Sequence, residues 1–401
     1  MPPYIIAHIF TIVKELKERK MKICAIICEY NPFHNGHQYQ LNIAREHMNA
    51  DALICIMSGN FVQRGENTIL DKYTRAKHAV LAGADAVIEL PTPFATSNAE
   101  LFAKGAIHVL SSIPEVEYLC FGAERADKLA FIQAARYLND EPKEVSEIIK
   151  NEIAGGSSYA KARANAFAGF IPLDLLCSSN NILGLEYTRA ILEKQSSIQI
   201  VPIQRTGANY NDEELKENFS SASAIRGALQ TGETVGSNVP EFVGKDLENA
   251  TNVSLDKLEK YAVISQGRQE LAKICDCTEG LENAFYKAAT QEGDFVSALT
   301  SPRYTASRIR RIALQNLLKI PESLIRESLQ TPLYLRVLAA KKERNDVLSA
   351  LARSTFPIIA RSHDEDVLQG TAKACFTSDV FAEQIYKILN PIYNSDKNVF
   401  I

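Results

Sequence analysis

Two histidines near the start of the chain carry the clearest chemical signal in the sequence. His34 and His37 enclose Asn35 and Gly36 and follow the turn 29–33 directly. Two imidazoles three residues apart can aim N–H donors at one phosphate chain, where they stabilise charge on the α-phosphate and on departing pyrophosphate. The plainer interpretation is a pair of surface histidines in a turn. We favour a nucleotide site that performs adenylyl transfer because of the elements that surround the pair.

These elements read as a strand, a turn and a helix. Residues 22–28 are apolar and rich in isoleucine, which is typical of a buried parallel strand, and Asn31-Pro32 favours an extended turn after it. Gly36 allows the backbone to approach a ligand closely, and a helix is expected to open at His37 and run to Glu46. The positive end of a helix dipole favours phosphate oxygens at that point.

Further short apolar runs predict the rest of a sheet. They alternate with helical stretches, a pattern that indicates an α/β fold with a Rossmann-like parallel sheet. Ligands on such sheets bind at the carboxyl ends of the strands, where the chain places its unusual polar residues. The runs cover residues 52–57, 86–90, 118–121 and 198–203.

The pattern changes to amphipathic helices from about Asp246 onward. Helices are expected over 255–262, 280–291, 308–318 and 337–351. A Gly- and Pro-containing stretch at 232–250 suggests the boundary. The sequence thus predicts a helical N-terminal extension at 1–20, a nucleotide-binding α/β domain at 21–240 and a mainly α-helical domain at 241–401.

Composition places limits on the class of protein. The 401 residues have a net charge of −4, so no global positive field indicates nucleic acid, and RNA contacts would need a local patch. Eight cysteines, mostly in apolar runs, suggest the reducing cytoplasm. Cys275 and Cys277 form the only close pair, without the further Cys or His of a zinc site, so no metal site is expected. No segment is long enough to span a membrane.

A second anion site is suggested by Ser221, Ser223 and Arg226. Hydroxyl groups at a helix N-terminus, with an arginine in the first turn, can hold the β- and γ-phosphates. The alternative is an ordinary helix cap with a solvated arginine.

Asn180 and Asn181 also open a helix. Their amides can bind an adenine edge or a ribose, or can simply cap the helix. Gly122 ends a strand, where a glycine permits close approach of a nucleotide or merely makes a turn.

Three cations lie in or after the loop 58–66. Arg64, Lys72 and Arg75 could hold a carboxylate substrate, stabilise phosphate or contact RNA, and a solvated loop is the alternative.

The helical half contains two basic clusters. Arg303, Arg308 and Arg311 surround Tyr304, and guanidinium groups beside an aromatic ring suit an RNA backbone and stacked bases. A second cluster contains Lys341 and Lys342. Either cluster alone could be a solvated helix face, but together in an acidic chain they favour a local RNA-binding patch.

At this point a family resemblance becomes specific. From residue 21 to the mid 340s, the chain resembles the bacterial tRNA(Met) cytidine acetate ligase family, whose nucleotidyltransferase fold is shared with class I aminoacyl-tRNA synthetases. The long first motif is far more specific than a lone His-x-Gly-His. The matching segments are 29–37, 57–66, 83–91, 180–184, 221–226 and 303–305.

The resemblance implies a reaction. ATP, with Mg²⁺, would activate acetate as acetyl-adenylate, and the acetyl group would pass to N4 of the wobble cytidine of elongator tRNA(Met). His34, His37 and Arg226 would be catalytic, and these two histidines with Ser221, Ser223 and Arg226 would hold the phosphates. The ATP site implied by the resemblance comprises Ile27, Cys28, Glu29, Tyr30, Asn31, Pro32, Phe33, His34, Asn35, Gly36, His37, Gln40, Gly122, Asn180, Asn181 and Arg205.

Two departures from the family pattern stand out. Ser223 replaces an expected Thr and keeps the hydroxyl, whereas Pro302 replaces an expected Lys and removes a positive charge. Two other functions remain open: a small-molecule adenylyltransferase of cofactor synthesis, and a non-catalytic module that binds tRNA or nucleotide. The selection of acetate, the base that acts on the cytidine amine and the oligomeric state are not determined by the sequence.

Overall fold

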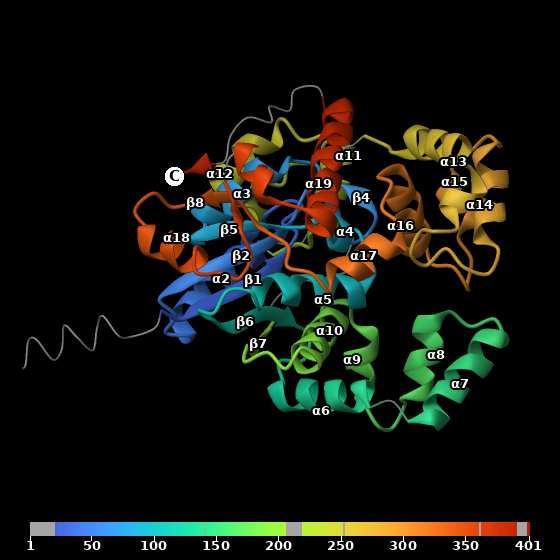
Figure 1. Cartoon of the computed structure of the whole chain (residues 1–401), viewed down its shortest axis with the longest axis horizontal. Helices are drawn as coiled ribbons and strands as arrows, with labels where there is room; N and C mark the ends of the chain where they lie inside the picture. Colours follow the sequence, from blue (N-terminus) through green and yellow to red (C-terminus); the bar gives the residue numbers. More distant parts are fainter. Residues whose placement is uncertain (1–20, 141, 206–218, 252, 361, 391–398) are drawn as a thin grey trace, which may run out of the picture.

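A sheet of mostly parallel strands forms the centre of the molecule (Figure 1). The computed structural model describes residues 21–140, 142–205, 219–251, 253–360, 362–390 and 399–401, so the expected extension at 1–20 lies outside the described residues. The main sheet contains β1 (Ile23–Cys28), β2 (Ala52–Ser58), β5 (Ala86–Leu90), β6 (Val116–Ala123), β7 (Gln199–Gln204), β8 (Leu335–Ala340), β9 (Ile358–Ile359) and β10 (Val399–Phe400).

The strand order confirms the predicted α/β class. The order is β10-β8-β5-β2-β1-β6-β7, with β9 also paired to β8, and the five strands from β5 to β7 run parallel. These five are the strands predicted from the apolar runs. In β1 and β2 nearly every side chain is buried, because helices cover both faces of the sheet.

The connections between strands determine which helices lie on which face. The chain proceeds from β1 to β2 and β5 in one direction and from β6 to β7 in the other. Because parallel crossovers are right-handed, α2 (Asn35–His47) and α3 (Lys72–Leu81) cover one face. The opposite face receives α5 (Ala99–Leu110), α6 (Lys128–Asn139) and α10 (Ser179–Glu193). The direction reverses between β1 and β6, which is where open α/β sheets bind ligands.

The remaining elements surround this sandwich. A short hairpin, β3 (Phe61–Val62) and β4 (Glu66–Asn67), lies in the loop after β2. None of the helices in the described ranges is long and apolar enough to cross a bilayer. The other helices are α4 (Thr92–Ala95), α7 (Lys143–Ala154), α8 (Tyr159–Ala166), α9 (Leu173–Cys177), α11 (Ala222–Thr231), η1 (Gly236–Asn238), α12 (Glu241–Leu247), α13 (Asp256–Leu271), α14 (Leu281–Ala289), α15 (Phe295–Leu299), α16 (Ala306–Leu317), α17 (Glu322–Ser328), α18 (Asn345–Leu351), η2 (Ser362–Val367) and α19 (Gly370–Leu389).

Helices α13 to α16 form a group to one side of the sheet (Figure 1). Their apolar faces enclose a separate small core, which includes Val263, Phe285, Phe295, Ile309 and Ile312. The helices predicted over 255–262, 280–291 and 308–318 are confirmed in α13, α14 and α16.

The helix predicted over 337–351 is wrong in its first half. Residues 335–340 form β8, which pairs antiparallel with β5, and a helix begins only at Asn345. The apolar run that suggested a buried helix face instead covers the open edge of β5, since an unpaired buried strand edge would leave backbone groups unsatisfied. Strands β8, β9 and β10 therefore return part of the range 241–401, which was expected to be mainly helical, to the central sheet.

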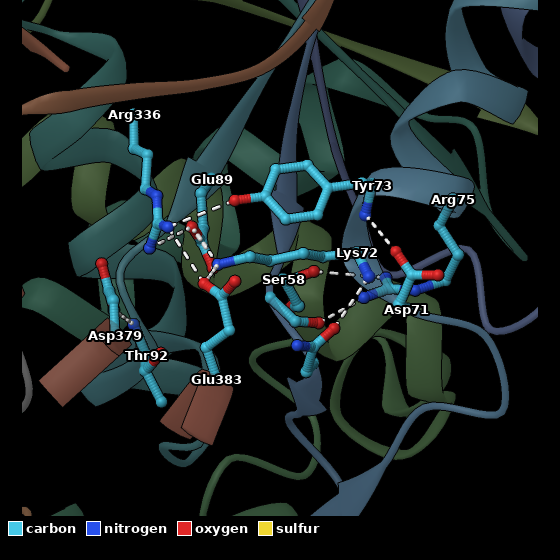
Figure 2. Close-up of polar contacts among 12 residues, drawn as sticks. Ser58, Asp71, Lys72, Tyr73, Arg75, Glu89, Thr92, Arg336, Asp379 and Glu383 are labelled. Carbon is cyan, nitrogen blue, oxygen red and sulfur yellow. Dashed lines mark hydrogen bonds and ion pairs between the residues drawn. The ribbon is translucent and has the colours of Figure 1, made fainter. Parts of the chain in front are cut away.

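A buried ionic network attaches the C-terminal helix α19 to this part of the sheet (Figure 2). The Lys72 ammonium lies 2.9 Å from both Glu89 and Glu383, and Arg336 bridges the same two carboxylates at 3.3 and 3.0 Å. Nearby, Asp379 accepts hydrogen bonds from the Thr92 N–H at 2.7 Å and the Tyr334 hydroxyl. The network joins α3, β5, β8 and α19.

Candidate active site

The first motif builds its own helix cap. His34 is the N-cap of α2 with extended backbone, and its Nδ1 accepts the Gly36 N–H at 3.1 Å. His37 Nδ1 accepts the His34 N–H at 3.2 Å, so the two histidines form a capping box. A Cβ on Gly36 would lie 2.9 Å from His34 Cε1. The glycine is thus explained by the space that the His34 ring requires, which the sequence alone does not reveal.

This cap determines where each imidazole carries its proton. Burial, with the Arg205 charge as a second cause, lowers the pKa of His34 to about 3, and burial also lowers the pKa of His37. Both rings are therefore neutral at physiological pH. Because each Nδ1 accepts a backbone N–H, we assign the proton to Nε2 in both rings. The stacked rings, 3.6 Å apart, offer two Nε2–H donors.

Two adjoining cavities lie beside these donors. One has a volume of about 150 Å³ and the other of about 50 Å³, and His37, Gln40, Gly122 and Arg205 line both. They sit where β1 and β6 end, at the reversal of strand order. Fourteen of the residues expected from the sequence line one cavity or the other: Ile27, Cys28, Glu29, Tyr30, Asn31, His34, Gly36, His37, Gln40, Gly122, Asn180, Arg205, Ser223 and Arg226.

Five other expected residues do not line these cavities. Phe33 is fully buried in the core, and Ser221 is the N-cap of α11, accepting the Ala224 N–H. The Asn35 amide donates to the Ser237 carbonyl at 2.8 Å, which attaches the segment after α11 to the first motif. Asn181 is buried and bonds the Asp174 carbonyl and the Arg125 N–H, so its polar atoms serve local structure. Pro32 lines neither of the two cavities.

Arg226 connects α11 to the first motif. Its guanidinium donates to the Asn31 carbonyl at 2.7 Å and lies 3.4 Å from the Ser223 hydroxyl. It also lies 3.7 Å from the Glu66 carboxylate. Ser223 and Arg226 of the predicted second anion site therefore share the larger cavity with His37, because α11 contacts the turn after β1.

Arg64, Lys72 and Arg75 lie in different surroundings in the structure. Arg64 lines the larger of the two cavities. Lys72 is buried in the ionic network, and the fully buried Arg75 donates to backbone carbonyls at Leu70, Glu29, Ser58 and Gly59. Lys72 and Arg75 thus stabilise the fold and cannot reach a substrate. Their burial in the folded chain decides this, and their spacing in the sequence does not reveal it.

Several apolar walls of the cavity were not predicted. Phe102, Phe121, Leu183 and Tyr187 line it and can enclose a nucleobase. A Cβ on Gly184 would lie 2.3 Å from the Phe121 ring, so a glycine is required where α10 crosses β6. A glycine inside a strong helical pattern was the available signal for this close packing.

The expected RNA-binding residues fall into two separate places. Arg308 donates to the Asp276 carbonyl at 2.7 Å, Arg303 pairs with Glu279 at 2.8 Å, and the largely buried Arg311 lies 3.9 Å from Asp276. These contacts join α16 to the loop before α14.

Lys341 and Lys342 lie at the amino ends of the parallel strands. Lys341 is 3.4 Å from Asp85, which precedes β5, and Lys342 is exposed. The two cavities beside His34 and His37 lie at the opposite, carboxyl ends. The structure does not bring the two basic clusters together into one patch, because residues 335–340 return to the sheet as a strand.

The fold and site together define the class of protein. The family model described as HIGH Nucleotidyl Transferase matches residues 21–399. The Clostridium perfringens protein named "tRNA(Met) cytidine acetate ligase" is 36% identical over 391 residues, covering 92% of this chain and 96% of the relative. A Thermoanaerobacter protein of the same name is 37% identical over 385 residues, covering 92% and 95%.

Solved structures agree with these sequence matches. The apo crystal structure of Thermotoga maritima TmcAL has a TM-score of 0.87 and 31% identity, covering 95% of this chain and all of the other. A second structure of that protein, bound with alpha-thio ATP, has a TM-score of 0.83 and 32% identity, covering 92% and 95%. The chain therefore belongs to the HIGH nucleotidyl transferases and, among them, to the tRNA(Met) cytidine acetate ligase family.

Proposed function

We propose that this chain is an ATP-dependent ligase that activates acetate as acetyl-adenylate and transfers the acetyl group to N4 of the wobble cytidine of elongator tRNA(Met), in the cytoplasm. The observation that carries the proposal is the pair of neutral histidines at two adjoining cavities: His34 and His37 line the smaller cavity, and His37 also lines the larger cavity together with Arg226. Two fixed donors beside an arginine suit a phosphate chain that develops charge during adenylyl transfer.

The first half-reaction depends on the positioning of the reactants and on electrostatic stabilisation more than on covalent catalysis. An acetate oxygen attacks the α-phosphorus, and the bond from that phosphorus to the pyrophosphate oxygen breaks. We assign His34 and His37 to the α-phosphate and the leaving pyrophosphate. Arg226 and the Ser223 hydroxyl, 3.4 Å apart, would hold the β- and γ-phosphates. Mg²⁺ would enter as MgATP, since the described residues contain no cluster of three or more side chains able to hold a metal ion.

Acetate itself needs a cation in the cavity. Of Arg64, Lys72 and Arg75, Arg64 alone lines the larger of the two cavities beside the histidines, which we call the nucleotide cavity. We therefore assign the acetate carboxylate to Arg64, whose guanidinium can bind both oxygens. Arg64→Ala should raise KM for acetate far more than KM for ATP, and Arg64→Lys should restore part of the loss. Equal increases in both KM values would contradict this assignment.

The second half-reaction makes the RNA product. The cytidine N4 attacks the acetyl carbon, the bond to the adenylate oxygen breaks, and AMP leaves while N4 loses a proton. Activation is required because acetate is a poor electrophile and an exocyclic amine a weak nucleophile.

The test uses the purified full chain with ATP, labelled acetate and elongator tRNA(Met). Acetylcytidine at the wobble position, with AMP and pyrophosphate in equal amounts, is the expected result. Pyrophosphate exchange that depends on acetate and occurs without tRNA would support the adenylate step separately. The absence of labelled cytidine with a correctly folded tRNA would overturn the assigned acceptor.

A further inference from the structure

A second and much larger cavity adjoins the nucleotide site. Its volume is about 900 Å³, and it lies between the sheet domain and the helices α13 to α16. Glu66, Ser223 and Arg226 line both this cavity and the nucleotide cavity. A ligand held in the larger cavity would therefore lie next to the adenylate.

The charges in the larger cavity do not suit a second polyphosphate. Five carboxylate residues line it, but only two arginines do, and both arginines already face Glu66, at 3.7 Å from Arg226 and 3.1 Å from Arg310. The lining carboxylates are Glu66, Glu233, Asp256, Glu259 and Asp294. A neutral group that offers hydrogen-bond donors fits this lining better than an anion does.

Four of these carboxylates have evident partners within the protein. Glu66 pairs with the two arginines, and Glu233 accepts the Thr231 hydroxyl at 2.6 Å. Asp256 pairs with Lys260 at 3.1 Å, and Asp294 caps α15. These contacts give each of the four a structural role.

Glu259 is different. It lies on α13, the residue as a whole is only 4% exposed, and no hydrogen bond or ion pair joins its carboxyl group to any of the residues that the structure describes. A buried carboxyl group without a partner is costly, so a protein that retains one has a use for it. A ligand bound in the cavity that Glu259 lines can supply this hydrogen-bond partner.

The protonation state of Glu259 further restricts the kind of chemical group that can bind to it. Burial raises the pKa of this carboxyl to about 8, with Asp256 and Asp294 raising it and Arg310 lowering it. At neutral pH the group therefore carries a proton and offers one O–H donor beside one carbonyl acceptor. Cytosine presents the complementary pair, an N3 acceptor beside the N4 amine donor, and carboxyl side chains are known partners of that amine.

We propose that Glu259 binds the Watson–Crick edge of the acceptor cytosine, which enters the larger cavity unstacked from the anticodon loop beside the acetyl-adenylate. This inference rests on the proposed function and adds the residue that positions the base. The base can be reached in this way because enzymes that modify a base, and proteins that read RNA loops, commonly take it out of its stack. The N4 amine would then face the wall shared with the nucleotide cavity.

Variants at Glu259 separate recognition from folding. Glu259→Met keeps the size and removes the polar group, so its melting temperature should equal or exceed that of the wild type. Its kcat/KM for acetyl transfer to tRNA should fall by about tenfold or more, and by much more than its rate of acetate-dependent pyrophosphate exchange. Glu259→Gln keeps one donor and one acceptor and should restore most of the transfer. Glu270→Gln, on an exposed carboxylate of the same helix that pairs with Lys273, is the matched control.

A pH profile supplies the readout that a purely structural role would not change. Transfer by the wild type should fall as pH rises through about 8, where Glu259 ionises, and transfer by Glu259→Gln should lack this decline. The charged groups that act on the Glu259 carboxyl are Asp256, Asp294 and Arg310.

Three outcomes would overturn the inference. The first is acetyl transfer to tRNA by Glu259→Met at the wild-type rate. The second is an equal loss of acetyl transfer and of pyrophosphate exchange in that variant. The third is the same pH profile of transfer for the wild type and for Glu259→Gln. A wild type that forms acetyl-adenylate but never acetylcytidine would instead refute the proposed acceptor, and the base-binding role with it.

Discussion

The two roles of His37 can be separated experimentally. Its Nδ1 accepts the His34 N–H at 3.2 Å and caps α2, whereas its Nε2–H is assigned to the phosphates. Removing one donor that acts in the transition state costs about 2.7 to 4 kcal/mol, or roughly 10² to 10³ in kcat. Loss of the cap costs about 1 kcal/mol of folding stability. His37→Ala should show both losses at once.

Two further substitutions at this position isolate the effects. An Asn amide reaches the place of Nδ1, so His37→Asn should recover stability but not activity. A Gln amide reaches the place of Nε2, so His37→Gln should recover part of the activity while losing the cap.

The assays are acetate-dependent exchange of pyrophosphate into ATP and urea-induced unfolding. His37 would not donate to the phosphates if His37→Ala lost less than about tenfold in exchange, or if His37→Asn restored exchange together with stability. Neither histidine acts in its protonated form, because burial lowers the pKa of both. The rate of pyrophosphate exchange should therefore not change between pH 6 and pH 8 in the way that the titration of a catalytic histidine would produce.

Three more predictions concern the packing around the site. Lys72→Met should cost about 3 to 5 kcal/mol of unfolding free energy, because it removes one of the two cations that neutralise the buried carboxylates of Glu89 and Glu383 and leaves Arg336 to pair with both; Lys72→Met combined with Glu89→Leu should cost less than Lys72→Met alone, and additive losses in denaturant titrations would contradict this. Gly184→Ala should cost about 1 to 3 kcal/mol and raise KM for ATP, since its Cβ would lie 2.3 Å from the Phe121 ring; an unchanged melting temperature would be inconsistent with that contact. Because the pKa of Glu259 rises from 4.5 to about 8 on folding, the folded state binds the extra proton between these values, so stability should fall as pH rises from 4.5 to 8. Thermal unfolding across this range should show a weaker decline in Glu259→Gln.

Local sequence was sufficient for the elements that hold the nucleotide site. The apolar runs predicted all five parallel strands, because a strand covered on both faces must be apolar along its whole length. The spacing of His34 and His37 indicated a pair acting together, and both line the predicted cavity. These features depend on residues adjacent in the chain, which is why they can be read without the fold.

Burial was the main property that the sequence could not supply. Arg64, Lys72 and Arg75 are similar in sequence, but one lines the cavity and two are buried among carboxylates or carbonyls. Residues 335–340 look like part of a helix until β5 provides an edge to pair with. Glu259 is an ordinary acid in a helical pattern, and its place in a cavity follows only from the fold, in which α13 packs against α16 and faces α11 across the cavity.

The sequence by itself therefore determined the class of fold, the histidine motif and, through resemblance, the family. Tertiary structure decided which charges are available to a ligand, which histidine nitrogens carry protons and where a second ligand fits beside the first. The physical reason is that strand and helix patterns are set by neighbouring residues. Desolvation and the pairing of charges, in contrast, depend on segments that meet only when the chain has folded, as Lys72 and Glu383 do.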